Sequence, residues 1–144
     1  MSTSVVRNGA DLTRLAGSDA VVEWFGEWPS FHDAEITEVV LSREGCSYLR
    51  LHAWKVSSET DGQGMYTRAK EAIVSFVIRE ITAMELRDLN GQNVIAGLTV
   101  TFTHESGWRV SLHGSYGLSG YIDADNVSVD IDQIRDPAGA TKSQ

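Results

Sequence analysis

The spacing of apolar residues along the chain changes near residue 34. Before that point, the segment NGADLTRLAGSDAVVEWFGEW (residues 8–28) contains two short helical patterns, with Gly17 and Gly26 as stop signals. Proline disfavours helical backbone in the residue before it, so Trp28-Pro29 favours an extended or turn conformation. We therefore expect two short helices, both ending before residue 28.

From residue 34 onward, apolar and polar residues alternate, which is typical of strands with one buried face. Residues 34–56 predict a hairpin that turns at residues 43–45. Its second strand alternates between two faces, one carrying Leu49, Leu51 and Ala53 and the other carrying Arg50, His52 and Trp54. The polar, Gly- and Ser-rich residues 57–67 predict a loop.

The remaining alternating segments predict further strands. Residues 71–89 predict two strands, residues 97–114 a hairpin, and residues 116–134 the strand region that completes the sheet. The tail at 136–144 has no apolar periodicity and is expected to fray. We expect one α+β domain over residues 1–144, ordered at about 10–135, with two short N-terminal helices packed on an antiparallel meander sheet of six to eight strands.

Composition narrows the classes of partner. The 144 residues are 42% hydrophobic, enough for one core, and no apolar run approaches the roughly 20 residues of a membrane helix. Twenty acidic against twelve basic residues give a charge of −8, which disfavours nucleic-acid binding. The acidic balance suits a basic protein partner, although it could serve solubility alone. The single cysteine, Cys46, and the absence of a secretory pattern in the first residues favour the cytoplasm.

The segment EWPSFHDAEI (residues 27–36) has the residue types of a metal site, because His32, Asp33 and Glu35 follow one another closely. Adjacent residues of an extended segment point to opposite sides, however, and no HExxH motif supplies further ligands. The structural interpretation is that Asp33 accepts backbone N–H bonds while Phe31 and His32 pack against the helices. We favour this interpretation and expect no metal or cofactor.

Other chemical motifs are incomplete. Cys46 has no recognisable nucleophile motif around it, and neither G-x-S-x-G nor S-x-x-K occurs. DADNVSVD (residues 123–130) has Ser128 where a calcium loop needs glycine. Gly117 and Gly120 favour a bulge or a close strand crossing. We therefore expect no catalytic residue and no enzymatic activity.

The polar faces of the strands provide candidates for partner binding. If the two strands that carry them are neighbours, their outward residues form a Trp- and Arg-containing surface of the kind found in protein–protein hot spots. An ordinary solvated sheet face is the alternative. The candidates are Arg50, His52, Trp54, Arg109 and His113, together with the carboxylates Asp130 and Asp132.

Two segments together, WPSFHDAEI (residues 28–36) and YGLSGYIDADNVSVDI (residues 116–131), resemble the bacterial family Immunity protein 50. The resemblance extends more loosely over residues 20–132. The residues that carry this signature are Trp28, Pro29, Phe31, His32, Asp33, Glu35, Gly117 and Gly120.

The resemblance implies a non-enzymatic protein of a polymorphic toxin system, one that binds and neutralises a cognate toxin in the cytoplasm. The sequence leaves the oligomeric state open between a monomer and a homodimer. The family assigns no catalytic role to the signature residues. We expect a basic toxin, with Asp130 and Asp132 opposing its charges. The alternatives are a small metal- or ligand-binding domain or enzyme using His32, Asp33 and Glu35 with a histidine such as His113, and a structural subunit of a larger assembly.

Overall fold

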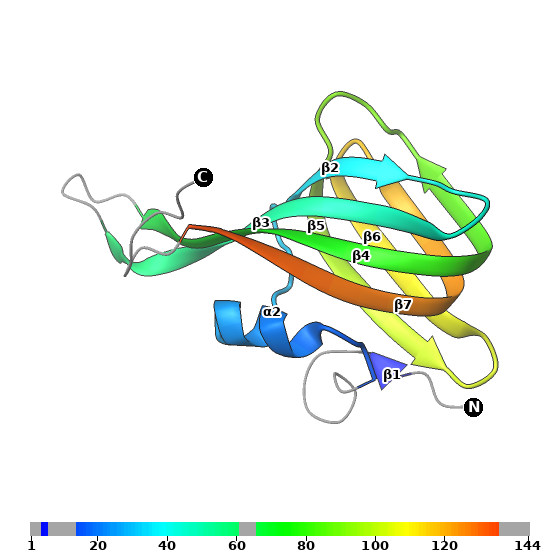
Figure 1. The fold of residues 1–144 in the computed structure, drawn as a ribbon. Coiled ribbons are helices and arrows are strands. Elements are labelled where there is room, and N and C mark those ends of the chain that lie inside the picture. Colours follow the sequence, from blue (N-terminus) through cyan, green and yellow to red (C-terminus); the bar gives the residue numbers. More distant parts are fainter. Residues whose placement is uncertain (1–3, 6–13, 61–65, 136–144) are drawn as a thin grey trace.

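The computed structural model describes residues 4–5, 14–60 and 66–135, with side chains described for residues 14–54 and 70–134. Strands dominate the molecule and accompany a single helix in this part of the chain (Figure 1). No helix here is long and apolar enough to cross a membrane. The elements in chain order are β1 (Ser4–Val5), α2 (Ser18–Phe25), β2 (Glu35–Val40), β3 (Cys46–Thr60), β4 (Tyr66–Arg87), β5 (Val94–Thr103), β6 (Gly107–Tyr116) and β7 (Ser119–Arg135).

All seven strands belong to one sheet whose strand order is β1-β5-β2-β3-β4-β7-β6, and β5 also pairs with β6. Every pair of neighbouring strands is antiparallel, which confirms the predicted antiparallel sheet. The predicted single meander is wrong, because β4 pairs with β7 rather than with β5. Two three-stranded meanders, β2-β3-β4 and β5-β6-β7, join at both sides, and the sheet closes on itself.

The predicted pair of helices is also wrong. Among the residues that the structure describes, the second helical pattern alone forms a helix, α2, which ends at Gly26, where the backbone N–H donates to the Val22 carbonyl over 2.7 Å. The first pattern falls largely on residues 6–13, outside the described residues, and residues 14–17 are not helical. The carbonyl of Ala16 instead accepts a hydrogen bond from the Val129 N–H over 2.8 Å. Ala16 thus forms an isolated β-bridge with Ser128 of β7. Because its carbonyl bonds to β7, it does not accept a hydrogen bond within a helix.

The strands are longer than their apolar pattern indicates. The predicted loop at 57–67 is largely strand, because β3 continues to Thr60 and β4 begins at Tyr66, and these two residues pair. The two strands predicted within 71–89 are one continuous strand, with Glu80 in a left-handed conformation (φ 58°). Backbone pairing extends a hairpin without apolar side chains, and here it produces an arm that projects beyond the sheet (Figure 1). The tail predicted to fray, 136–144, lies outside the described residues.

The core fills the inside of the closed sheet. The inward faces predicted by alternation are buried, including Leu49 and Leu51 on β3, Phe76 on β4 and Val100 on β5. Helix α2 packs mainly on β7 and β4, and its Val21 and Phe25 are buried in the same core. The polar residues that alternate with these core positions lie on the outside of the sheet.

Candidate functional site

The first of the two family-like segments, residues 28–36, closes the sheet between β2 and β5, and we call it the signature segment. The Ser30 carbonyl accepts a hydrogen bond from the Leu98 N–H over 3.2 Å. The Asp33 N–H donates to the Ile95 carbonyl over 2.9 Å, and the Ile95 N–H donates to the Ala34 carbonyl over 3.0 Å. β2 itself pairs with β5 only at Glu35 and Val94. The bonds from the signature segment provide hydrogen-bond partners for the backbone groups of Ile95 and Leu98, so the segment has a structural role.

An aromatic cluster anchors this segment from inside. Phe31 is 3% exposed, and its ring centroid lies 5.7 Å from that of Trp28 and 5.9 Å from that of Phe76 on β4. Both pairs are edge-to-face, the arrangement that aromatic quadrupoles favour. Phe31 therefore packs on the sheet core beside Trp28.

His32 and Asp33 lie outside the core. The His32 Nδ1 and the Asp33 Oδ2 are 3.2 Å apart, and the two side chains are 67% and 59% exposed. Glu35 begins β2, opposite His52 of β3. His113 lies on β6, where its Nε2 is 3.2 Å from the Thr99 hydroxyl. Among the residues that the structure describes, no three His, Cys, Asp or Glu side chains gather as a metal site would require.

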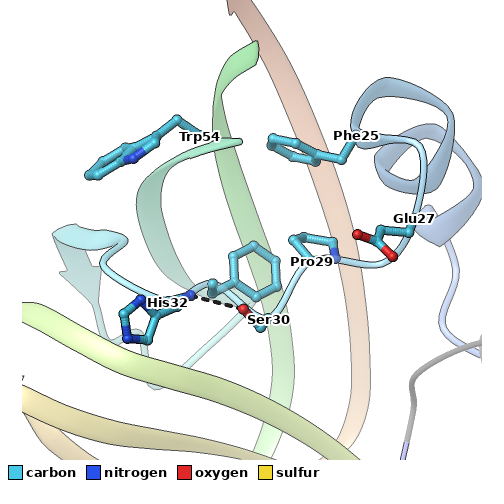
Figure 2. Close-up of a pocket in the computed structure, with 7 residues that line it drawn as sticks. Phe25, Glu27, Pro29, Ser30, His32 and Trp54 are labelled. Carbon is cyan, nitrogen blue, oxygen red and sulfur yellow. Dashed lines mark hydrogen bonds between the residues drawn. The ribbon is translucent and has the colours of Figure 1, made fainter. Parts of the chain in front are cut away.

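A hollow of about 200 Å³ opens beside the signature segment, and we call it the aromatic hollow. It lies between the end of α2, the segment after it and β3 (Figure 2). Trp54 and Phe25 lie on one side of it in this view and Pro29 and His32 on the other. Its lining includes Phe25, Glu27, Pro29, Phe31, His32 and Trp54.

A second feature is the outward side of β3, β4 and β7, which we call the outer face. The register places Arg50 of β3, Ser75 of β4 and Asp130 of β7 in one row across these strands. The next row contains His52, Ile73 and Asp132. The outer face comprises Tyr48, Arg50, His52, Trp54, Glu71, Ile73, Ser75, Val77, Ser128, Asp130 and Asp132.

The side chains of β3 on the outer face are held in place. The His52 Nε2 lies 3.1 Å from the Glu71 Oε1, and the His52 ring meets the Trp54 ring edge-on at 5.3 Å between centroids. The Arg50 Nη1 donates to the Glu38 Oε1 over 2.7 Å, and its guanidinium lies 5.1 Å from the Tyr48 ring centroid.

The residues that define the outer face include three carboxylates, Glu71, Asp130 and Asp132, and one guanidinium, that of Arg50. Glu38 on β2 balances the guanidinium of Arg50. Asp130 and Asp132, by contrast, are exposed on β7.

Arg109 and His113 are not part of this surface, because β6 does not neighbour β3 and pairs with β7 only at residues 120–124, away from Ser128, Asp130 and Asp132. Arg109 donates from Nε and Nη2 to both carboxylate oxygens of Asp123, over 2.6 and 2.9 Å. Its guanidinium lies 4.1 Å from the Tyr121 ring centroid. The hydrogen bonds to Asp123 raise the pKa of Arg109 above its ordinary value. The combined surface of the two strands proposed from the sequence therefore does not form.

The two signature glycines lie where backbones approach closely. Gly117 has φ 85°, and a Cβ there would overlap the Asn93 Oδ1. Gly120 has φ 134°, and a Cβ there would overlap the Glu85 carbonyl oxygen of β4. Both positions exclude a side chain on steric grounds.

Sequence reasoning missed two buried polar residues, Asn93 and Glu71. Asn93 Oδ1 accepts hydrogen bonds from the backbone N–H groups of Leu118 and Asn90, each over 3.0 Å. No pattern around Asn93 distinguishes it from an ordinary loop residue. Alternation could have predicted the position of Glu71. Ala72 and Val74 point inward, so Glu71 points outward, on the same face as His52.

Comparisons of the chain with protein-family models, with curated proteins and with solved structures find no significant match. The resemblance to Immunity protein 50 stays a prediction from the sequence.

Proposed function

We propose that this protein is an immunity protein that binds a cognate bacterial toxin domain and neutralises it by steric occlusion. The observation that carries the proposal is the outer face, where the register aligns five of the seven predicted partner-binding residues across β3 and β7, with β4 between these two strands. The resemblance of the two sequence segments supplies the class of partner.

The composition of the outer face suits a protein partner. Tyr, Trp and Arg are enriched in interface centres, and here Tyr48, Arg50 and Trp54 follow one strand. Three adjacent strands span only about 10 Å, whereas a stable interface buries about 800 Å² of each partner. The outer face would therefore form the centre of the contact, with adjoining surfaces completing it.

The charge of the chain indicates the chemistry of the partner. Asp130 and Asp132 are exposed at the β7 side of the outer face, and the whole chain carries −8. Opposed charges steer encounter and disfavour wrong partners, so the proposed toxin presents a basic surface. We place the encounter in the cytoplasm, where Cys46, a free thiol, would stay reduced.

The test is co-expression with the toxin-like protein encoded beside this chain, scored by growth rescue and by recovery of a one-to-one complex. Trp54→Ala should weaken the complex at least about tenfold, as truncation of a central aromatic residue does. Tyr116→Ala is the matched control, because Tyr116 is 66% exposed on β6, off the outer face, and it should bind like the wild type. Absence of both rescue and complex would contradict the proposal.

A further inference from the structure

We propose that the aromatic hollow receives one arginine side chain of the toxin. This inference rests on the proposed function, since the toxin supplies the arginine. It assigns a specific contact to a feature that lies beside the outer face and shares Trp54 with it.

The size of the hollow favours a single side chain over a free metabolite. Its volume is about 200 Å³, below the range of roughly 300–1,000 Å³ that small-molecule sites occupy. One end of the hollow meets β3 at Trp54, and the other is the turn after α2 at Glu27 (Figure 2). A side chain projecting from a partner on the outer face could therefore enter past Trp54.

The lining favours a planar cation. Trp54 and Phe25 contribute aromatic rings to the lining, and a guanidinium stacks on such rings more readily than the compact, strongly hydrated ammonium of lysine does. Glu27 contributes a carboxylate, which can accept two parallel hydrogen bonds from a guanidinium.

The remaining titratable group in the lining is compatible with a cation. His32 has the carboxylate of Asp33 3.2 Å from its Nδ1. The lining thus contains one carboxylate, that of Glu27, and one imidazole, and Asp33 adds a second carboxylate beside that imidazole. The net charge of −8 on the chain adds a favourable field for a cation.

The direct test uses ethylguanidinium as the probe and N-ethylurea, its neutral counterpart, as the matched control. The full chain labelled with ¹⁵N at its four tryptophan indoles is titrated with each compound, and Trp54→Phe identifies the Trp54 signal. Ethylguanidinium should shift the Trp54 indole signal along a saturating curve, and N-ethylurea should shift it at least about fivefold less. Equal shifts with the two compounds, or no shift with ethylguanidinium, would overturn the proposal.

Two substitutions separate the charge of Glu27 from general acidity. Glu27→Gln should weaken ethylguanidinium binding at least about threefold, whereas Glu23→Gln, an exposed position on α2 outside the lining, should leave it unchanged. Both are surface changes, and an unaltered indole spectrum without probe confirms that each variant is folded. Wild-type affinity in Glu27→Gln would overturn the assignment of Glu27.

Failure of this inference and failure of the proposed function give different results. Growth rescue without ethylguanidinium binding overturns the arginine site and leaves the immunity function standing. Ethylguanidinium binding without rescue or complex overturns the immunity function, and with it the toxin as the source of the arginine. With the complex in hand, one toxin Arg→Lys substitution should weaken binding in the wild type but not in Trp54→Phe combined with Glu27→Gln.

Discussion

At the scale of single residues, the signature segment holds two non-glycine residues in left-handed conformations, Phe31 at φ 62° and Asp33 at φ 68°. This conformation costs an L-residue about 1–2 kcal/mol, and aspartate tolerates it better than phenylalanine does. Burial of a phenylalanine side chain contributes about 1.5–3 kcal/mol, so the packing of Phe31 on Trp28 and Phe76 offsets the cost. The same backbone turn directs His32 outward, beside the aromatic hollow.

Gly120→Ala should destabilise the protein by about 3 kcal/mol or more, because its Cβ would displace the backbone of β4 at Glu85 in addition to the strain of φ 134°. Gly45→Ala is the control, with φ 86° and open space around its Cβ, and it should cost only about 1–2 kcal/mol. Urea unfolding of both variants measures the difference. Equal losses would mean that β4 and β7 do not approach as closely at Gly120 as the structure shows.

Asn93→Ala should cost about 2–3 kcal/mol, because it leaves the buried N–H of Leu118 without its acceptor. The neighbouring Asn90→Ala should cost less than about 1 kcal/mol. The Asn90 side chain is exposed, and the Gln92 N–H that donates to its Oδ1 can donate to water instead. Thermal or urea unfolding distinguishes the two. A small loss in Asn93→Ala would show that water replaces the amide.

At the scale of elements, the segment before α2 protects an exposed strand edge. The ladder between β6 and β7 stops at Ala124, whereas β7 continues to Arg135. Ala16 bonds to Val129 on that open edge, and α2 follows directly. An uncovered edge can pair with another chain, so this contact guards against aggregation as well as fixing the helix.

Arg109→Lys tests the ion pair between Arg109 on β6 and Asp123 on β7. Lysine would lose the two-pronged contact with Asp123 and the stacking on Tyr121, at a cost of about 1 kcal/mol given that Arg109 is half exposed. Arg87→Lys is the control, because Arg87 makes one contact to Glu85 on the same strand, and its effect should be within about 0.3 kcal/mol. Urea unfolding at low and high salt measures both, and equal effects would contradict a special role for the pair.

At the scale of the whole molecule, the alternation along each strand identified most of the core but not the way the strands assemble. Leu49, Leu51 and Ala53 showed their buried face because β3 has one side in the core and the other side outside. The pairing of β4 with β7 joins residues far apart in sequence, and no local pattern encodes it. The few apolar residues of the arm of β3 and β4 predict a loop, whereas the register pairs its strands, with Val56 opposite Arg68 and Thr60 opposite Tyr66.

The candidate site was predictable only in part, for the same reason. The sequence named His32 and Trp54 separately, but their meeting in the aromatic hollow depends on the path of residues 27–34 along β5. That path depends on the closure of the sheet. Outward residues of β3 were predictable from their spacing, whereas the distance of Arg109 from them follows from the strand order.

If the proposed function holds, association with the proposed toxin should depend on salt, because the contact brings the carboxylates of Asp130 and Asp132 against a basic surface. Asp130→Asn combined with Asp132→Asn should slow association about three- to tenfold at low ionic strength and much less at high salt. Glu105→Gln, in the turn between β5 and β6, is the control and should leave the rate unchanged. Stopped-flow association rates test this, and a rate independent of salt would rule out electrostatic steering.

The bond between Ala16 and Val129 also bears on how the protein is made in the cell. This bond joins a segment that is synthesised early to β7, which is synthesised late, and β4 also needs β7 as its pairing partner. Long-range pairings of this kind slow folding, and exposed strand edges are vulnerable until they are filled. The nascent chain therefore cannot complete its fold before β7 has left the ribosome, so a shortage of chaperones should reduce the yield of this protein more than that of a helical protein of equal length.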